Sequence, residues 1–149
     1  MSTSLPSELV WNSILVPLDL SDCSRDALRR SVAIARSQPG SRMTLLAVVE
    51  PVHTGLRVQT TDLHQQMKKE AEATLMTWLA EEASDLSPTP KCLILEGVPG
   101  AVICDEAERG SYDLIVVGSH GRTGLTRYLL GSVAERVVRH APCEVLVAR

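Results

Sequence analysis

A glycine-rich segment near the end of the chain carries the residue types best suited to chemistry. The segment reads GSHGRTGLTRYLLGS and places Gly118, Gly121 and Gly131 between an aliphatic run and a helical pattern. Glycine has no Cβ atom and tolerates positive φ, so main-chain N–H groups can approach an anion closely here. Ser132 follows the last glycine, where the positive end of a helix dipole begins. The segment therefore predicts a phosphate-binding loop, with Arg122 adding positive charge.

The length and composition of this connection separate it from the familiar phosphate loops. About thirteen residues lie between the aliphatic run and the helical pattern, whereas β-to-α connections usually contain about two to six residues. A plain flexible connection is the alternative interpretation, and the unusual length weighs against it. The segment contains no lysine, which a Walker A loop requires, and its glycines do not follow the G-x-G-x-x-G spacing. We therefore expect a phosphate cradle of a different type.

Five aliphatic runs alternate along the chain with segments of helical character. The runs cover residues 13–19, 42–51, 91–97, 112–119 and 143–149, and the helical segments cover residues 20–40, 61–83, 98–111 and 132–141. Each strand must cross over a helix before the next strand begins, which predicts a parallel sheet. The runs are continuous rather than alternating, so helices are expected on both faces. The predicted fold class is α/β, a three-layer sandwich, with Trp78 in its core and Trp11 against a sheet edge or a partner.

The candidate site should lie at one edge of this sheet. Ligands of open parallel sheets bind beyond the carboxyl ends of the strands, where the chain order changes sides. Pro17, Leu18 and Asp19 follow the first aliphatic run, and Val48 lies at the end of the second. The glycine-rich segment follows the fourth run, so these residues are expected to meet. The alternative role for Asp19 is to cap the first helix or turn, and Val48 is alternatively a plain core residue. Ser21 or Asp22 can cap the helical segment that follows, because their side-chain oxygens accept the free N–H groups of its first turn.

Composition limits the classes of partner and the cellular location. A length of 149 residues allows one domain with a proper core, and Phe is absent, so that core must be aliphatic. A formal charge of −3 argues against general affinity for nucleic acid or for anionic membranes. No apolar run is long enough to span a bilayer, and the first residues do not resemble a secretory signal. We therefore expect a cytoplasmic protein.

The cysteines and histidines do not indicate a metal or redox centre. The four cysteines are scattered without a C-x-x-C pair, and the four histidines form no zinc-binding pattern. The cysteines are expected to be small buried hydrophobic residues. His120 has no nucleophile or orienting carboxylate at a readable spacing, so a loop or surface role is preferred over general-base catalysis. Arg127 and Arg136 either reach a phosphate or lie on a solvated face.

Three separated segments resemble the universal stress protein family. GSHGRTGLTRYLLGS matches the family pattern Gly-x2-Gly-x9-Gly-Ser/Thr without a gap. ILVPLDLSDCSRDAL is similar to the opening strand and helix of the family, and AERVVRHAPCEVLVAR is similar to its closing helix and strand. The resemblance covers about residues 12–149, interpreted as one domain, with residues 1–11 as an N-terminal extension. It implies a five-stranded parallel sheet in the order 3-2-1-4-5.

The resemblance also implies a ligand, because family members with this glycine pattern bind ATP. Asp19 would contact the ribose or an associated metal ion such as Mg, and the main chain of Val48 would pair with the adenine edge. Pro17 and Leu18, directly before Asp19, complete that part of the expected site. The phosphates would be held by Gly118, Gly121, Arg122, Gly131, Ser132 and Val133. Whether the resident nucleotide is ATP, ADP or AMP stays open.

The resemblance further implies a homodimer through the last strand, residues 143–148, whose bare edge invites pairing. The first interpretation of function is an ATP-binding regulator or sensor in the stress response, whose state a partner protein reads. The alternatives are a slow ATPase or other phosphoryl-transfer enzyme, and a dimeric scaffold that binds no nucleotide. Phosphoryl transfer needs charge neutralisation and an oriented attacking group. Beyond Asp19 we find neither a second acidic ligand nor a base, so no catalytic residue is assigned.

Two other protein classes share the alternating layout and do not fit the residues. A phospho-accepting receiver domain would need an aspartate at the end of the third strand, where the sequence reads ILEGVPG. A flavodoxin-like carrier would need aromatic groups against its flavin, and the chain has two Trp, two Tyr and no Phe. Both classes are therefore excluded.

Overall fold

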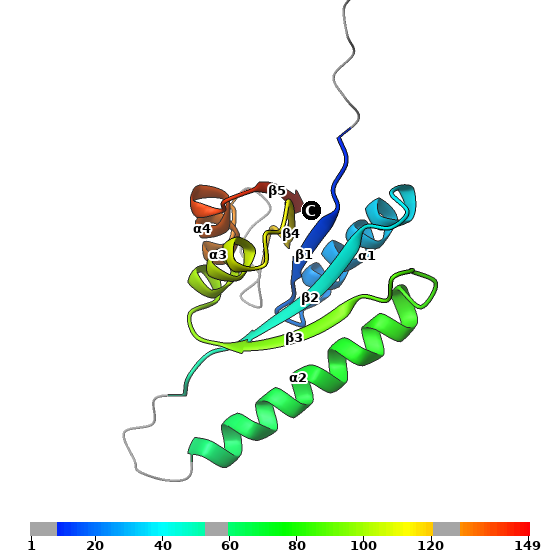
Figure 1. Ribbon diagram of the computed structural model, residues 1–149. Helices are drawn as coiled ribbons and strands as arrows, with labels where there is room; N and C mark the ends of the chain where they lie inside the picture. Colours follow the sequence, from blue (N-terminus) through cyan, green and yellow to red (C-terminus); the bar gives the residue numbers. More distant parts are fainter. Residues whose placement is uncertain (1–8, 53–59, 121–128) are drawn as a thin grey trace, which may run out of the picture.

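The computed structural model describes residues 9–52, 60–120 and 129–149, in which strands and helices alternate throughout. The elements are β1 (Ser13–Pro17), α1 (Asp22–Ser37), β2 (Arg42–Val49), α2 (Thr60–Glu82), β3 (Lys91–Glu96), α3 (Pro99–Arg109), β4 (Leu114–Gly118), α4 (Ser132–His140) and β5 (Glu144–Ala148). The five strands form one parallel sheet in the order β3-β2-β1-β4-β5 (Figure 1). The α/β class, the parallel sheet and the 3-2-1-4-5 order are therefore confirmed.

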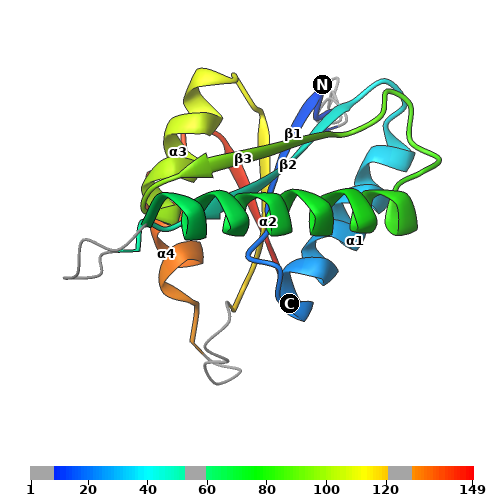
Figure 2. The same ribbon diagram turned by 90° about the horizontal axis from the view of Figure 1, so that it is seen from below.

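The sheet is covered on both faces, which explains why its central strand is continuously aliphatic. All five residues of β1 are buried. Their side chains alternate between faces: Ile14 and Val16 belong to the core beneath α1 and α2, and Leu15 belongs to the core beneath α3 and α4. Figures 1 and 2 show these two pairs of helices on opposite sides of the sheet. Two aliphatic cores therefore hold the three layers together.

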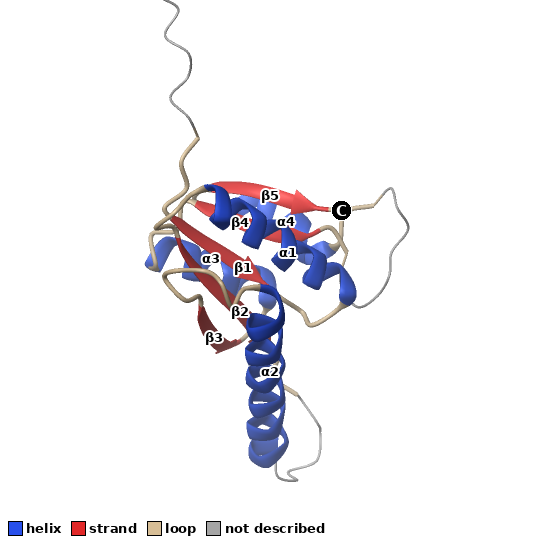
Figure 3. Cartoon of the chain, turned by 90° about the vertical axis from the view of Figure 1, so that its right-hand side faces the viewer, coloured by secondary structure: helices blue, strands red, loops and turns tan. Residues whose placement is uncertain are grey.

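Helix α2 matches the predicted boundaries to within a residue, but one predicted core position is wrong. Leu75 is fully buried and Trp78 is 8% exposed, so the core position of Trp78 is confirmed. The three- and four-residue spacing of apolar side chains in residues 61–83 predicts that Leu63 lies on the same apolar line, but Leu63 is 49% exposed. Figure 3 shows that the start of α2 projects past the sheet, so Leu63 lies at the margin of the sheet, where β3 ends at Glu96. Helical periodicity identifies a face, and the length of the sheet decides how much of that face is buried.

Trp11 packs at the amino end of the sheet, next to an edge strand, as predicted. Its indole N–H donates a hydrogen bond to the carboxylate of Glu144, the first residue of β5. Its main-chain N–H donates to the side-chain oxygen of Gln38 at 2.7 Å, which ties it to the end of α1. The ring also packs against the core beneath α1 and α2.

The four cysteines are partly buried free thiols, and Cys92, Cys104 and Cys143 pack against the two cores. Burial raises the pKa of the thiols of Cys92, Cys104 and Cys143, so the neutral form is favoured. This agrees with their predicted role as small hydrophobic residues. Among the described residues, none of the helices is both long and apolar enough to cross a membrane.

An arginine–carboxylate network joins α1 to the end of α2. Arg25 lies over the Trp78 ring, 5.3 Å from its centroid, and its Nε donates to Glu82 at 2.8 Å. Arg29 Nε donates to the same Glu82 oxygen at 3.0 Å. The hydrogen bond from Arg25 is the largest cause that lowers the pKa of Glu82, and Arg29 lowers it further. The Glu82 side chain is only 17% exposed, so this pair is screened less than a fully solvated one.

Glu82→Gln should therefore change how stability depends on pH. A carboxylate with a lowered folded-state pKa stabilises the fold above its unfolded-state pKa, and this contribution is lost as the pH falls through the folded-state value. We expect the variant to unfold at a lower temperature than the natural chain at pH 7. The gap between the two melting temperatures should narrow as the pH falls below about 4. Melting followed by circular dichroism from pH 7 to pH 3 measures both effects.

The matched control is Glu135→Gln, which removes an exposed i,i+4 partner of Arg139 on α4. Exposed pairs contribute little to stability, so this variant should follow the natural chain at every pH. A gap between Glu82→Gln and the natural chain that stays constant from pH 7 to pH 3 would contradict the assigned role of Glu82.

Candidate functional site

At the carboxyl end of the sheet, where the topology predicts a ligand crevice, strand β1 ends before its neighbour β2 does. The main-chain N–H of Leu18 donates to the carbonyl of Leu46 at 2.8 Å, after which the chain turns into α1. Strand β2 continues to Val49, whose carbonyl accepts from Gly97 N–H on the β3 side at 3.1 Å. Main-chain groups alternate sides along a strand, so the N–H and C=O of Val48 face the β1 side, beyond the point where β1 has left. One donor and one acceptor are thus presented side by side.

Asp19 lies at the turn between β1 and α1, half-buried, with its carboxylate held by a neighbour. Its Oδ1 atom accepts hydrogen bonds from the main-chain N–H of Ser21, at 3.0 Å, and from the Ser21 hydroxyl. Leu20, between them, has a φ of 67°, a left-handed conformation that is uncommon for a residue with a side chain. Ser21 is also the N-cap of α1 and accepts from Ser24 N–H at 3.3 Å. The predicted helix cap is confirmed at Ser21, and Asp19 acts on that cap.

Gly118 ends β4 on the other side of β1, and its lack of a side chain allows a close approach. A Cβ atom at this position would lie 3.3 Å from both the carbonyl oxygen and the Sγ atom of Cys23, in the first turn of α1. Gly118 does not adopt a left-handed conformation. The lack of a side chain at Gly118 therefore serves the close packing of β4 against α1. It does not serve a positive φ, which the glycine motif had suggested.

Ser119 closes the base of the glycine-rich connection and was missed by the sequence analysis. It is 2% exposed, and its N–H donates to the Ala148 carbonyl of β5 at 2.8 Å. Its carbonyl accepts from Gly131 N–H at 2.8 Å, and its hydroxyl lies 2.8 Å from His120 Nδ1. The two ends of the connection are thereby held together. A serine directly after an aliphatic run is common, so the local sequence around Ser119 does not predict that this residue closes the connection.

The amino end of α4 presents main-chain donors at two of the predicted residues, Ser132 and Val133, but not at Gly131. Gly131 is the N-cap, with φ −60° and ψ 153°, and its own N–H is bonded to Ser119. The first bond of the helix runs from Glu135 N–H to the Gly131 carbonyl at 2.9 Å. The N–H groups of Ser132 and Val133 therefore precede the helical ladder, and the cap has no side-chain hydrogen bond. Donors for an anion come from these two residues rather than from Gly131.

The remaining predicted residues differ in how much the structure says of them. Pro17 and Leu18 are buried at the end of β1, directly before Asp19. Gly121, Arg122 and Arg127 lie outside the described residues. Arg136 extends over α3, because a Cβ atom at Gly100 would meet its side-chain carbons, the nearest of them at 2.5 Å. Its side chain therefore packs along α3. No group of three or more potential metal-binding His, Cys, Asp or Glu side chains occurs within residues 9–52, 60–120 and 129–149.

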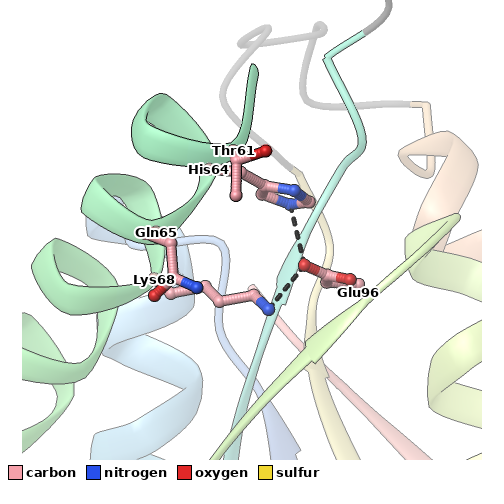
Figure 4. A pocket seen from close by; sticks show the side chains of 5 residues that line it. All are labelled: Thr61, His64, Gln65, Lys68 and Glu96. Atoms are coloured by element: carbon pink, nitrogen blue, oxygen red, sulfur yellow. Dashed lines mark ion pairs between the residues drawn. The ribbon is translucent and has the colours of Figure 1, made fainter. Parts of the chain in front are cut away.

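A separate hollow of about 170 Å³ lies between the start of α2 and the end of β3 (Figure 4). Lys68 Nζ and His64 Nε2 both approach Glu96 Oε1. The distance from His64 Nε2 to this oxygen is 3.2 Å, and the contact is ionic only when the histidine ring is protonated. The hydrogen bond from Lys68 lowers the pKa of Glu96. The charges of these groups neutralise one another. The three side chains line the hollow and form an ion-paired clamp between α2 and β3. A second hollow, of about 480 Å³, lies beside Trp11 and Gln38 at the opposite end of the sheet.

Comparison of the sequence and the structure with known proteins identifies the family of this chain. The model of the universal stress protein family matches residues 11–149. The chain belongs to the universal stress protein family. A universal stress protein of Methanocaldococcus jannaschii is 34% identical over 143 residues, which cover 95% of this chain and 84% of that protein. The solved structure of a universal stress protein from Lactobacillus plantarum is similar with a TM-score of 0.86 and 30% identity, over 95% of this chain and all of that one.

Two more distant universal stress protein structures contain an adenine nucleotide. One, in complex with cAMP, has a TM-score of 0.68 and 23% identity, over 95% of this chain and 99% of that one. The other, from Arabidopsis thaliana with AMP bound, has a TM-score of 0.61 and 19% identity, over 92% of this chain and 90% of that one. At these identities the likeness establishes the shared fold, and the nucleotides are properties of those relatives.

Gly118→Ala tests the close approach on which the crevice depends. The added Cβ atom would crowd Cys23, so β4 and the first turn of α1 must separate by a few tenths of an ångström. Overpacking of this kind costs about 1 kcal/mol or more, which for a chain of this size lowers the melting temperature by about 2–4 °C. The double variant Gly118→Ala with Cys23→Ala removes the Sγ contact and should recover part of the loss. An unchanged melting temperature in Gly118→Ala would show that the two elements do not meet as described.

Proposed function

We propose that this universal stress protein binds ATP, or its relatives ADP and AMP, in the crevice beside β1 and acts as a dimeric regulator. The observation that carries the proposal is that two separate sets of main-chain hydrogen-bonding groups occur at the same end of the sheet. Val48 presents a donor and an acceptor on the β2 side. Ser132 and Val133 present helix-end donors after β4. A nucleotide needs both kinds of contact, one for its base and one for its phosphates.

The base would lie against Val48. The adenine edge offers one hydrogen-bond donor and one acceptor side by side, and the N–H and C=O of Val48 are complementary to that pair. Guanine presents a different arrangement on the same edge, so the main chain alone discriminates between the two. Pro17 and Leu18, buried at the end of β1, would form the apolar floor under the base and sugar.

The ribose and phosphates would lie between Asp19 and α4. A carboxylate accepts hydrogen bonds from ribose hydroxyls, and it also attracts a Mg ion that arrives with the phosphates. The phosphates would be held by the N–H groups of Ser132 and Val133, by the Ser132 hydroxyl and by the positive end of α4. Gly118 and Gly131 would contribute by having no side chain, and Gly121 and Arg122 are proposed from the motif.

A regulator is favoured over an enzyme because no catalytic base is assigned beside Asp19, and the described residues contain no group of three or more His, Cys, Asp or Glu side chains that could hold a metal ion. Slow ATP hydrolysis is the second candidate, favoured by that same carboxylate. The dimer is proposed through residues 143–148, since β5 is an edge strand that pairs only with β4 among the described strands. The relatives with bound cAMP and AMP support the general idea that this fold accommodates adenine nucleotides. A nucleotide-free scaffold would leave the helix-end donors without a role.

Ser132→Pro should remove a phosphate donor and leave the helix intact. Proline is favoured at the first position of a helix, and the residue before it prefers the extended conformation that Gly131 already has. The substitution deletes one main-chain N–H and one hydroxyl. We expect the affinity for ATP to fall about tenfold or more, with little change for adenosine, which has no phosphate. Isothermal titration of the natural chain and of Ser132→Pro with ATP, GTP and adenosine measures these affinities directly.

Three results of that titration carry information. Ser132→Ala, which removes only the hydroxyl, should lose less ATP affinity than Ser132→Pro. GTP should bind more weakly than ATP to the natural chain. No heat from the natural chain with any of the three ligands would favour the scaffold, and an equal loss for ATP and adenosine in Ser132→Pro would indicate a changed fold rather than a lost donor.

ATP turnover, where it occurs, should be well below about 10 per second, a typical median for enzymes. The reason is the lack of an evident base near Asp19 among the described residues. Phosphate release in the presence of Mg measures the rate for the natural chain and for Asp19→Asn. Rapid release that disappears in Asp19→Asn would make the protein an enzyme and overturn the regulator assignment.

A further inference from the structure

We infer that Ser21 is a positioning residue that orients the Asp19 carboxylate toward the ribose of a bound nucleotide. The inference rests on the proposed function and adds a residue to it. Ser21 is not part of the glycine motif, and its predicted role was limited to capping α1. Its contacts in the structure extend to the one acidic side chain that the proposal places against the ligand.

The first step of the argument is that both donors of Ser21 converge on one oxygen. The main-chain N–H reaches Asp19 Oδ1 at 3.0 Å, and the hydroxyl donates to the same atom. Two donors from one residue fix both the position of Oδ1 and the plane of the carboxylate. An ionised carboxylate has about four acceptor positions, which is more than the two that the bonds from Ser21 use. Hydrogen bonds to a carboxylate are also stronger than neutral ones.

The second step is that the backbone is arranged for this contact. Leu20 has a left-handed conformation, with φ of 67°, and its side chain packs against the core beneath α1 and α2. This turn brings the N–H and hydroxyl of Ser21 back over Asp19. Left-handed residues other than glycine are held in place by their surroundings. Here the surroundings include the Leu20 side chain on one side and the two Asp19–Ser21 bonds on the other.

The third step separates this role from helix capping. The Ser21 oxygen accepts from Ser24 N–H at 3.3 Å, while the hydroxyl hydrogen is given to Asp19. Loss of the cap lowers stability and has no preference for any part of a ligand. Loss of the Asp19 contact changes the recognition of ribose hydroxyls. The two roles therefore have different readouts in the same variant.

The experiment compares ATP with 2′,3′-dideoxy-ATP, which lacks both ribose hydroxyls, by isothermal titration. Ser21→Ala should weaken ATP about five- to tenfold and change the affinity for the dideoxy nucleotide by less than about twofold. Ser21→Thr keeps the hydroxyl and should retain most of the ATP affinity. In an Asp19→Ala background, Ser21→Ala should no longer change the affinity for ATP, whereas it should lower the melting temperature in both backgrounds.

The matched control is Ser24→Ala, in the same turn. The Ser24 hydroxyl donates to the main-chain carbonyl of Ser21 at 2.9 Å and is buried away from the crevice. This variant should lower the melting temperature and leave the ratio of ATP to dideoxy-ATP affinity unchanged. Equal weakening of both nucleotides by Ser21→Ala, or weakening that persists in the Asp19→Ala background, would overturn the positioning role alone. A natural chain that binds neither nucleotide would overturn the proposed function together with it.

Discussion

The early departure of β1 from the centre of the sheet is the constraint on which the rest of the structure depends. The last ladder bond, from Leu18 N–H to the Leu46 carbonyl, marks where the strand turns into α1 while β2 continues to Val49. Helix α1 then covers one face of the sheet and α4 covers the other. The chain must separate at this point, so a crevice at the β1 end follows from topology. On this side of β2 the main-chain groups of Val48 lie beyond the last residue of β1 that pairs with β2.

Recognition by main chain leaves the side chains free to build the fold. The two cores are aliphatic, and the polar residues near the crevice mostly fix the backbone: Ser119 closes the base of the glycine-rich connection, and Ser21 holds Asp19. The strong charge pairs lie elsewhere. Arg25 and Glu82 join α1 to α2, and Lys68 and Glu96 join α2 to β3. Helix α2 is thus attached at both ends by ion pairs, and the proposed ligand site is built independently of them.

Local patterns were sufficient to predict the strands, the helices and the parallel sheet, and the strand order followed from the family resemblance. Neither predicted which residues contact one another within the fold. Continuous aliphatic runs such as 13–19 indicated buried parallel strands, and α2 was predicted to within a residue. Leu63 was placed in the core wrongly, because periodicity does not show where the sheet ends beneath a helix. The glycine pattern correctly located the amino end of α4 but suggested that Gly131 would offer its amide, which Ser119 in fact accepts. Contacts between residues far apart in the chain, such as Trp11 with Glu144, carry no signal in either local sequence.

The most direct test of the central claim is a residue-by-residue map of nucleotide contact in solution. Amide resonances in ¹H–¹⁵N spectra of the whole chain, recorded while ATP is added, report each main-chain N–H separately. The account predicts large shifts at Val48, Gly118, Ser132 and Val133. The two indole N–H groups, of Trp11 at the far end of the sheet and of Trp78 in the α1–α2 interface, should stay in place. Shifts confined to the clamp around His64 and Lys68, or none at saturating ATP, would contradict the account.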